Sequence, residues 1–308
     1  MTQESTDITF LNCPFTGRNL RFLSQAELNE VNMKIASNEL FFYPGAQVNK
    51  PLKQALVTEH QTYIYPILDN IVLLKKETAI VAKNRTENYL KRVSDHIISY
   101  FDGLYSFEAG DQEEEVLGVN KTASLMPSEE ISLIKQRLPK SSNVFVSMAS
   151  DNIDDVHNLV FNCKFRKYVH ADFDIDRLRS VKRELPKETL LILCDNTDLP
   201  FSDDSIGAIV SFDHINQYDK ENQKVISGEM NRVLDADGVS IVMFDADKPL
   251  AAGRQLKKDQ LAKKAQGLLK PWKKIKNPTI YFHPVNGDKV TDMPSTIAGK
   301  TSLNRQLF

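Results

Sequence analysis

The sequence has little cysteine, little net charge and no long apolar run, and each shortage excludes a class of protein. Three cysteines, Cys13, Cys163 and Cys194, lie far apart among 308 residues, which argues against a disulfide framework and favours a reducing compartment. The formal net charge of −2 provides no global attraction to nucleic acid or to anionic membranes. No apolar run approaches the roughly 20 residues that cross a bilayer, and the first residues lack the pattern of a secretory leader. We therefore expect a cytoplasmic protein without a membrane segment.

The chain does contain enough apolar sequence for a sizeable core. Of its 308 residues, 41% are hydrophobic and 26% are charged, which fits two globular domains, or one domain with an extension. Changes of pattern divide the chain into three parts. We expect a small α+β domain over residues 1–82, a helical linker over 83–125, and an α/β domain with a basic extension over 126–308.

The third part alternates apolar strands with helices. This pattern is typical of a Rossmann-like, mostly parallel sheet that carries helices on both faces. In such a sheet, ligands bind at the carboxyl ends of the strands, near the switch in strand order. The strands are expected at 143–149, 167–173, 189–194, 206–212, 239–244 and 279–283.

The turn after the first of these strands has no glycine. Residues 144–152 read VFVSMASDN. Glycine in this turn would let the backbone approach a bound ligand closely. We therefore expect a turn of another shape, which weakens a carboxylate pocket there but leaves a nucleoside pocket possible.

Several motifs of this part resemble those of class I S-adenosylmethionine (SAM) methyltransferases of the type 11 family, with a degenerate glycine motif. The resemblance rests on DLPF at 198–201 and on EMNRVLDADG at 229–238, and it spans about residues 126–245. It implies a SAM cofactor, with Asp172 at the ribose position and Asp195 at the adenine position. The full set of cofactor-binding residues that it implies is Met148, Ala149, Asp172, Phe173, Asp195, Asn196 and Phe212.

No residue stands out as catalytic. His214, at the end of the fourth expected strand, is a weak candidate for a general base because the pKa of histidine lies near neutrality. Methyl transfer can also proceed when two reactants are simply held in line. We therefore expect a SAM-dependent methyltransferase that acts on a small molecule. Two alternatives stay open: an inactive methyltransferase-fold scaffold that binds a protein partner, and a nucleoside pocket repurposed for another reaction.

The first part resembles the Trm112-like family, a small module related to zinc ribbons. The resemblance rests on LNCPFTGRNL at 11–20, on ALVTEHQTYIYPILDNIVLL at 55–74, and on Glu77-Thr78-Ala79. Zinc-binding members use four cysteines, whereas only Cys13 is present here, and one thiolate cannot build a tetrahedral site. We expect no zinc and no other metal. Free-standing members resemble activating partners of methyltransferases, so this part could brace the second domain or bind a further partner.

Local patterns predict three features inside this first part. Ser24 followed by Glu27 predicts a helix that starts with a capping box. Residues 55–72 predict a hairpin with its turn near His60. Pro66 predicts that one strand of the hairpin is an edge strand or ends irregularly.

Two further segments carry a pattern without a firm function. Tyr100-Phe101-Asp102 lies in an amphipathic stretch that, in the resembling methyltransferases, closes over the cofactor. Residues 254–276 hold nine Lys or Arg and a single acid, Asp259. Clustered cations can bind phosphates, but we favour a solvated amphipathic helix over contact with nucleic acid.

Overall fold

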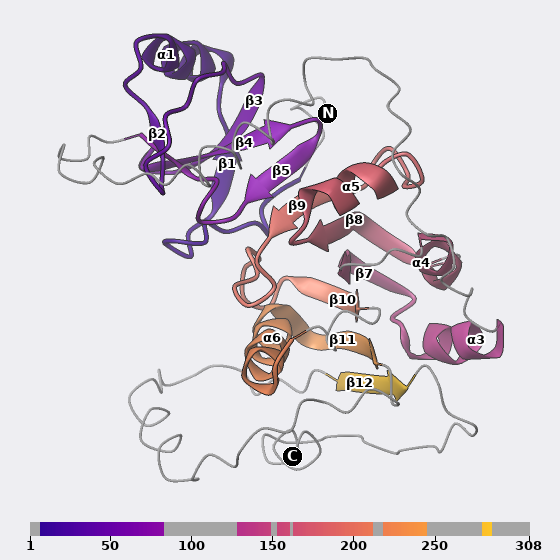
Figure 1. The fold of residues 1–308 in the computed structure, drawn as a ribbon. Coiled ribbons are helices and arrows are strands. Elements are labelled where there is room, and N and C mark those ends of the chain that lie inside the picture. The colour runs from indigo at the N-terminus through magenta and orange to yellow at the C-terminus, as the bar shows by residue number, and fades with distance from the viewer. Residues whose placement is uncertain are drawn as a thin grey trace, which may run out of the picture.

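The structure, a computed structural model, describes residues 7–82, 128–148, 153–160, 163–211, 218–244 and 279–284. These residues form one 12-stranded sheet (Figure 1). The strand order along it is β1-β3-β4-β5-β9-β8-β7-β10-β11-β12, and the short strands β2 and β6 lie off this path.

Residues 7–82, here called the N-terminal module, form one end of the sheet. The module contains one described helix, α1 (Gln25–Ala36), and its strands are β1 (Leu20–Phe22), β2 (Phe41–Phe42), β3 (Gln54–Thr58), β4 (Tyr63–Leu68), β5 (Ile71–Leu74) and β6 (Ile80–Val81). The predicted capping box is confirmed, because the Ser24 hydroxyl accepts the Glu27 amide while the Glu27 carboxylate accepts the Ser24 amide. The predicted hairpin is confirmed as the antiparallel pair β3·β4.

The rest of the sheet is parallel and is covered by helices. Its strands are β7 (Ser141–Met148), β8 (Lys164–Asp172), β9 (Leu190–Cys194), β10 (Ile206–Ser211), β11 (Leu234–Phe244) and β12 (Thr279–Pro284), and its helices are α3 (Ser128–Arg137), α4 (Ile153–Val160), α5 (Ile175–Val181) and α6 (Lys220–Val233). β7 lies between β8 and β10, so the strand order reverses there. The predicted Rossmann-like fold class is confirmed. In sheets of this kind, ligands bind at the carboxyl ends of the strands beside such a reversal, which here are the ends of β7, β8 and β10.

The prediction that Pro66 marks an edge or an irregular end was wrong. β4 is an interior strand, in which Pro66 lies opposite Ala55 of β3. On its other side β4 pairs with β6 at Tyr63 and Ile64, and with β5 at Ile67 and Leu68. Pro66 therefore sits where this side of β4 changes partner, a position at which a missing N–H costs least.

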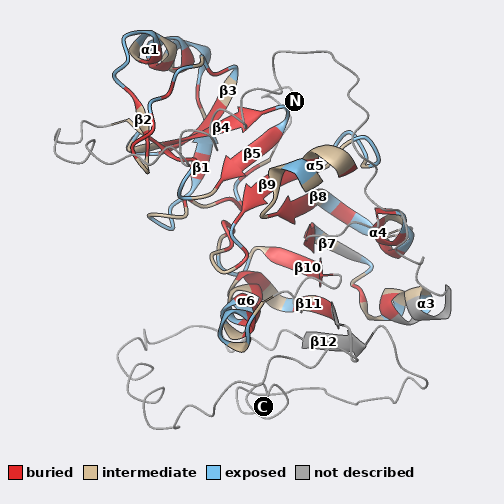
Figure 2. Cartoon of the chain, in the orientation of Figure 1, coloured by how far each residue is buried: buried red, intermediate tan, exposed pale blue. Residues whose placement is uncertain are grey.

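The N-terminal module and the parallel strands share one hydrophobic core. β5 pairs with β9 in parallel, from Ile71 opposite Leu191 to Leu74 opposite Cys194. Figure 2 shows that β4, β5, β9 and β10 are buried almost throughout. Strands buried on both faces read as continuous apolar runs, and IVLL at 71–74 and LLILC at 190–194 are such runs.

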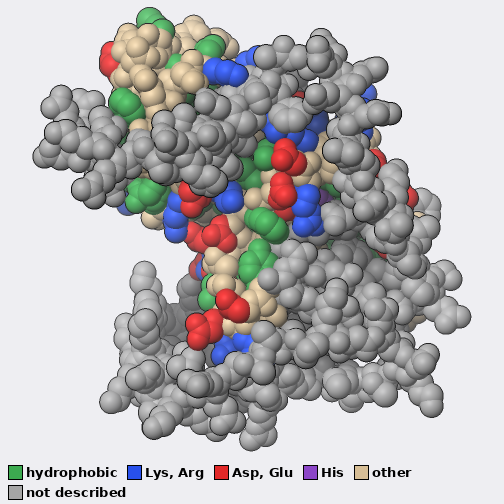
Figure 3. All heavy atoms as spheres, viewed as in Figure 1, with side chains coloured by type: hydrophobic (Ala, Val, Ile, Leu, Met, Phe, Trp, Pro, Cys, Tyr) green, Lys and Arg blue, Asp and Glu red, His purple; other side chains and the backbone are tan. Residues whose placement is uncertain are grey.

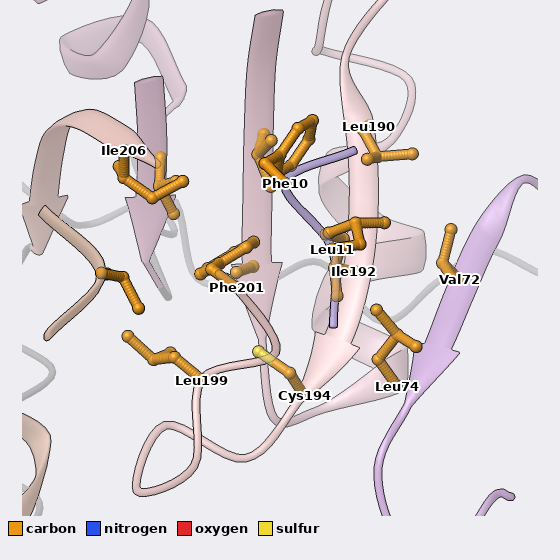
Figure 4. Close-up of a cluster of buried hydrophobic side chains, with 14 of the residues drawn as sticks. Phe10, Leu11, Val72, Leu74, Leu190, Ile192, Cys194, Leu199, Phe201 and Ile206 are labelled. Atoms are coloured by element: carbon orange, nitrogen blue, oxygen red, sulfur yellow. The ribbon is translucent and has the colours of Figure 1, made fainter. Parts of the chain in front are cut away.

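The segment that precedes β1 adds to this shared core. Figure 4 shows Phe10 and Leu11 beside Ile192 and Phe201, with Leu74 of β5 in the same cluster. Backbone bonds fix the arrangement: the Asn12 amide donates to the Pro200 carbonyl at 2.9 Å, and the Ser202 amide donates to the Phe10 carbonyl at 2.8 Å. The module is therefore bound to the second part by strand pairing, by apolar burial and by backbone hydrogen bonds.

His170 is a buried polar residue of the parallel part of the sheet. It lies on β8 opposite Ser147 of β7, with 1% of its surface exposed. Among the described contacts, neither its Nδ1 nor the Ser147 hydroxyl has a hydrogen-bond partner. Burial, with a smaller effect of the Arg177 charge, lowers the pKa of His170 from 6.5 to about 4.

We expect the His170→Leu substitution to make the free energy of unfolding less dependent on pH below about pH 6.5. Because the folded pKa lies below the unfolded one, the neutral His170 contributes stability above pH 6.5, and this is lost as the pH falls toward 4. At pH 5 the loss is about 2 kcal/mol. Urea unfolding should therefore show that the free energy of unfolding falls less between pH 7.5 and pH 5 in His170→Leu than in the wild type, by about 2 kcal/mol. Ser147→Ala, which removes no titrating group, is the control, and an unchanged pH difference in His170→Leu would contradict the account.

Candidate functional site

The candidate site is centred on Asp172, the last residue of β8. Its side chain is 1% exposed. Oδ1 accepts the backbone amide of Asp174 at 2.9 Å, and Oδ2 lies 3.3 Å from Nε of Arg177 in the first turns of α5. A carboxylate at this edge is thus held by its own loop and by the following helix.

Burial dominates the electrostatics of Asp172. It raises the pKa of this carboxyl from 3.8 to about 6, while the Arg177 charge and the Asp174 amide lower it. Asp172 is therefore ionised at neutral pH, but with little margin. An ionised carboxylate at a strand end can accept two hydrogen bonds from the hydroxyls of a ribose.

The neighbouring strand, β9, ends in a tight polar turn. The exposed Asp195 accepts both the amide and the hydroxyl of Thr197 through Oδ1, at 2.8 and 2.7 Å. The amide of Asp198 donates to the Asp195 carbonyl at 3.1 Å. Asn196 points inward from this turn and is fully buried. The amide of Asn196 is thus better enclosed than the carboxylate of Asp195.

Tyr218, just before α6, connects the two turns. Nδ2 of Asn196 donates to the Tyr218 hydroxyl at 3.2 Å, and the Tyr218 ring meets the Phe173 ring edge to face, with centroids 6.4 Å apart. Burial raises the pKa of Tyr218, and the charges of Asp195 and Asp172 add to the effect. A carboxylate, an amide and two aromatic rings therefore meet at the carboxyl ends of β8 and β9.

The structure brings together four of the residues that the motifs predicted: Asp172, Phe173, Asp195 and Asn196. Met148 ends β7 at the same edge, but its side chain is fully buried in the core, so only its backbone could meet a ligand. The predicted Ala149, Phe212 and His214 lie outside the described residues, as do Tyr100-Phe101-Asp102 and residues 254–276. All of these assignments to a cofactor stay predictions.

Sequence reasoning missed Arg177, Tyr218 and Lys75. Arg177 lies in the first turn of α5, the helix that follows Asp172, so its closeness in the sequence could have revealed it. Tyr218 lies beyond the fourth strand, and no local pattern marks it. Lys75 donates from Nζ to the Phe173 carbonyl at 3.2 Å, and only the pairing of β5 with β9 brings it there.

Cys13 occupies an apolar position in the N-terminal module. It is 1% exposed, and its Sγ lies 3.1 Å from the hydroxyl of Tyr65. Burial raises the pKa of the Tyr65 hydroxyl, and the neighbouring Cys13 raises it further. Within the described ranges, His, Cys, Asp and Glu form no group of three that could hold a metal ion. The prediction that the module binds no zinc stays a prediction.

One family matches part of the chain. Residues 156–242 match the methyltransferase domain family, which confirms over this part the resemblance that the motifs indicated. No curated protein matches the sequence. Among the helices that the structure describes, none is long and apolar enough to cross a membrane.

Solved structures align with the chain only in part. A chain of the complex between the Haloferax volcanii Trm112 methyltransferase activator and a putative methyltransferase is 17% identical, with a TM-score of 0.31 over 35% of this chain and 47% of that chain. A putative methyltransferase of Bacillus halodurans C-125 is 16% identical, with a TM-score of 0.31 over 36% and 48%. A protein of Xylella fastidiosa is 26% identical, with a TM-score of 0.22 over 28% and 94%. The chain thus spans about half the length of the first two proteins.

Proposed function

We propose that this chain is a SAM-dependent methyltransferase that acts on a small molecule and binds the adenosine half of SAM at the carboxyl ends of β8 and β9. One observation carries the proposal: a buried carboxylate, Asp172, and a buried amide, Asn196, from adjacent strands meet around Tyr218. The match of residues 156–242 to the methyltransferase domain family supports it.

The described residues fit the adenosine half of the cofactor. Asp172 would hold the ribose hydroxyls, Asn196 and Asp195 would hold the adenine, and the rings of Phe173 and Tyr218 would flank it. When bound, SAM supplies a methyl group that its sulfonium makes electrophilic.

The chain's own groups prepare Asp172 for this role. The Asp174 amide fixes Oδ1, and Arg177 keeps the charge on the carboxyl. A carboxylate has about four acceptor positions, so a ribose hydroxyl could share an oxygen with either group. Positions 149–152, at the expected methionine end, and Phe212 and His214, on the acceptor side, lie outside the described residues.

A second candidate function is that of a non-catalytic scaffold. Both oxygens of Asp172 already have partners within the chain, and the turn at 149–152 has no glycine. A site whose acceptor groups are satisfied internally gains less from a ligand, because the ligand must compete for them. The same binding experiment decides between the two candidates.

S-adenosylhomocysteine (SAH) is expected to stabilise the full chain. At 100 times the dissociation constant, binding to the folded state adds about 2.7 kcal/mol to the free energy of unfolding. Asp172→Ala should abolish this stabilisation, because it removes the acceptor for both ribose hydroxyls. Thermal shift and calorimetry at pH 7.5 measure both effects.

Two further variants make the result specific. Asp176→Ala, an exposed aspartate on the same helix α5, should keep the wild-type shift. Asp172→Asn keeps the volume of the side chain and should still lose most of the affinity, which separates loss of binding from loss of folding. If millimolar SAH leaves the melting temperature of the wild type unchanged, the chain is a non-catalytic scaffold. Transfer of labelled methyl to protein or nucleic acid, instead of to the small molecules of a cell extract, would overturn the proposed acceptor.

A further inference from the structure

The N-terminal module brings two consecutive lysines to the edge of the sheet where the candidate site lies. β5 runs parallel to β9, and its last residue, Leu74, is paired with Cys194, the last residue of β9. Lys75 and Lys76 therefore leave the sheet beside Asp195, although they are far from it in the sequence.

Each lysine holds a different turn of the site. Nζ of Lys75 donates to the carbonyl of Phe173 at 3.2 Å, in the turn between β8 and α5. Nζ of Lys76 lies 2.6 Å from Oδ2 of Asp198, in the turn after β9. The first turn follows the ribose candidate Asp172, and the second begins with the adenine candidate Asp195.

A buried threonine fixes the backbone from which both lysines extend. The hydroxyl of Thr78, fully buried, lies 3.0 Å from the Leu73 carbonyl and 2.9 Å from the Lys75 carbonyl, and it accepts the Lys75 amide at 3.2 Å. Thr78 belongs to the Glu77-Thr78-Ala79 motif. The motif thus fixes the backbone from which the lysines extend. A side chain can hold a site in place only if its own backbone is rigid.

The charges favour a holding role over the binding of an anion. The Asp198 carboxylate raises the pKa of Lys76, so this ammonium group stays charged. Oxygen atoms of the chain itself engage both ammonium groups. On the face shown in Figure 3, acidic and basic side chains are interspersed over α5 and toward the N-terminal module.

We propose that Lys75 and Lys76 are positioning residues, through which the N-terminal module holds the turns that carry Asp172 and Asp195 in the conformation that a nucleoside needs. Turns that are ordered before binding reduce the entropic cost of taking up the ligand. The proposal relies on the proposed function for the identity of the ligand, whereas the order of the turns is measurable in the free chain.

Hydrogen exchange of the ligand-free full chain tests the holding role directly. Lys75→Met should speed exchange in the peptide that covers 173–178, and Lys76→Met should do so in the peptide that covers 195–201. The expected increase is about three- to tenfold, equivalent to the loss of one hydrogen bond or ion pair. Lys34→Met is the matched control, because Lys34 forms a similar exposed pair with Glu30 at 2.7 Å, on α1. Unchanged exchange in both turns, relative to this control, would overturn the proposal.

Titration with SAH adds a readout that a purely structural role would not change. We expect Lys75→Met to raise the dissociation constant about three- to tenfold, with the melting temperature of the free chain equal to that of Lys34→Met. Lys75→Arg, which can still donate to the Phe173 carbonyl, should restore most of the affinity. A weaker affinity that Arg does not restore, or one matched by a general loss of stability, counts against positioning. If the wild type binds no SAH, the proposed function fails and the exchange data alone decide on the lysines.

Discussion

Arg232→Met is expected to lower the free energy of unfolding by about 2–4 kcal/mol, since it removes several charge-assisted hydrogen bonds at once. Arg232, near the end of α6, donates to the carbonyls of Leu199 and Phe201 at 2.7 and 2.8 Å. It also donates to Glu229 at 2.9 and 2.7 Å and to Asp203 at 3.0 Å. These bonds give Arg232, within the EMNRVLDADG motif at 229–238, a structural role.

The loss of stability should extend beyond Arg232, because its partners support the turn after β9 that begins with Asp195. The Leu199 amide donates to Glu229 at 2.9 Å, and the Phe201 ring lies 6.2 Å from that of Phe10 in the N-terminal segment. Without Arg232, the Phe201 carbonyl loses its side-chain donor, whereas the Leu199 carbonyl keeps the Phe201 amide and Glu229 keeps the Leu199 amide. Leaving a buried acceptor unpaired costs more than the bond itself contributes.

Urea unfolding measures the effect as a change of midpoint at constant slope. Arg21→Met is the matched control, because Arg21 pairs with Glu27 at 2.6 Å on the exposed surface of the N-terminal module. An exposed ion pair contributes at most about 1 kcal/mol. If Arg232→Met costs no more than Arg21→Met, the bonds around Arg232 do not stabilise the fold as described.

The affinity for SAH is expected to fall as the pH drops below about 6. The ionised form of Asp172 accepts the ribose hydroxyls, and burial raises its pKa to about 6. Affinity should therefore be constant above this pH and decrease by up to about tenfold for each unit below it. Calorimetric titration between pH 5 and pH 8 measures the profile.

Arg177→Gln should move this profile to higher pH. The Arg177 charge lowers the pKa of Asp172, so its removal raises the midpoint of the profile. Arg179→Gln, an arginine of the same helix that pairs with the exposed Asp176, should leave the midpoint in place. A flat profile, or equal midpoints in wild type and Arg177→Gln, contradicts the role given to Asp172.

The stability of the ligand-free chain should depend on the titration of Asp172 in the opposite direction to the affinity for SAH. The folded pKa lies above the ordinary value of 3.8, so the ionised carboxyl is less favourable in the folded than in the unfolded state. The contribution of Asp172 to stability therefore decreases as the pH rises from about 4 to about 6 and is constant above that. Titration of the Asp172 carboxyl by NMR, in the absence of ligand, locates the same pKa independently of binding.

The sequence by itself determined the features that depend on neighbouring residues. The capping box of α1 needs only Ser24 and Glu27, and the alternation of apolar strands with helices needs only local periodicity. The position of Asp172 at the end of β8 follows from the same periodicity, because a strand ends where its apolar run ends.

Only the tertiary structure decided which strands are neighbours, and with that most of the candidate site. Lys75 reaches the turn after Asp172 because β5 pairs with β9, and Pro66 is tolerated inside the sheet because β4 changes partner beside it. Strand pairing joins segments that are distant in the sequence. The order of the strands depends on how apolar faces are buried across the whole sheet, and a short stretch of sequence does not contain this information.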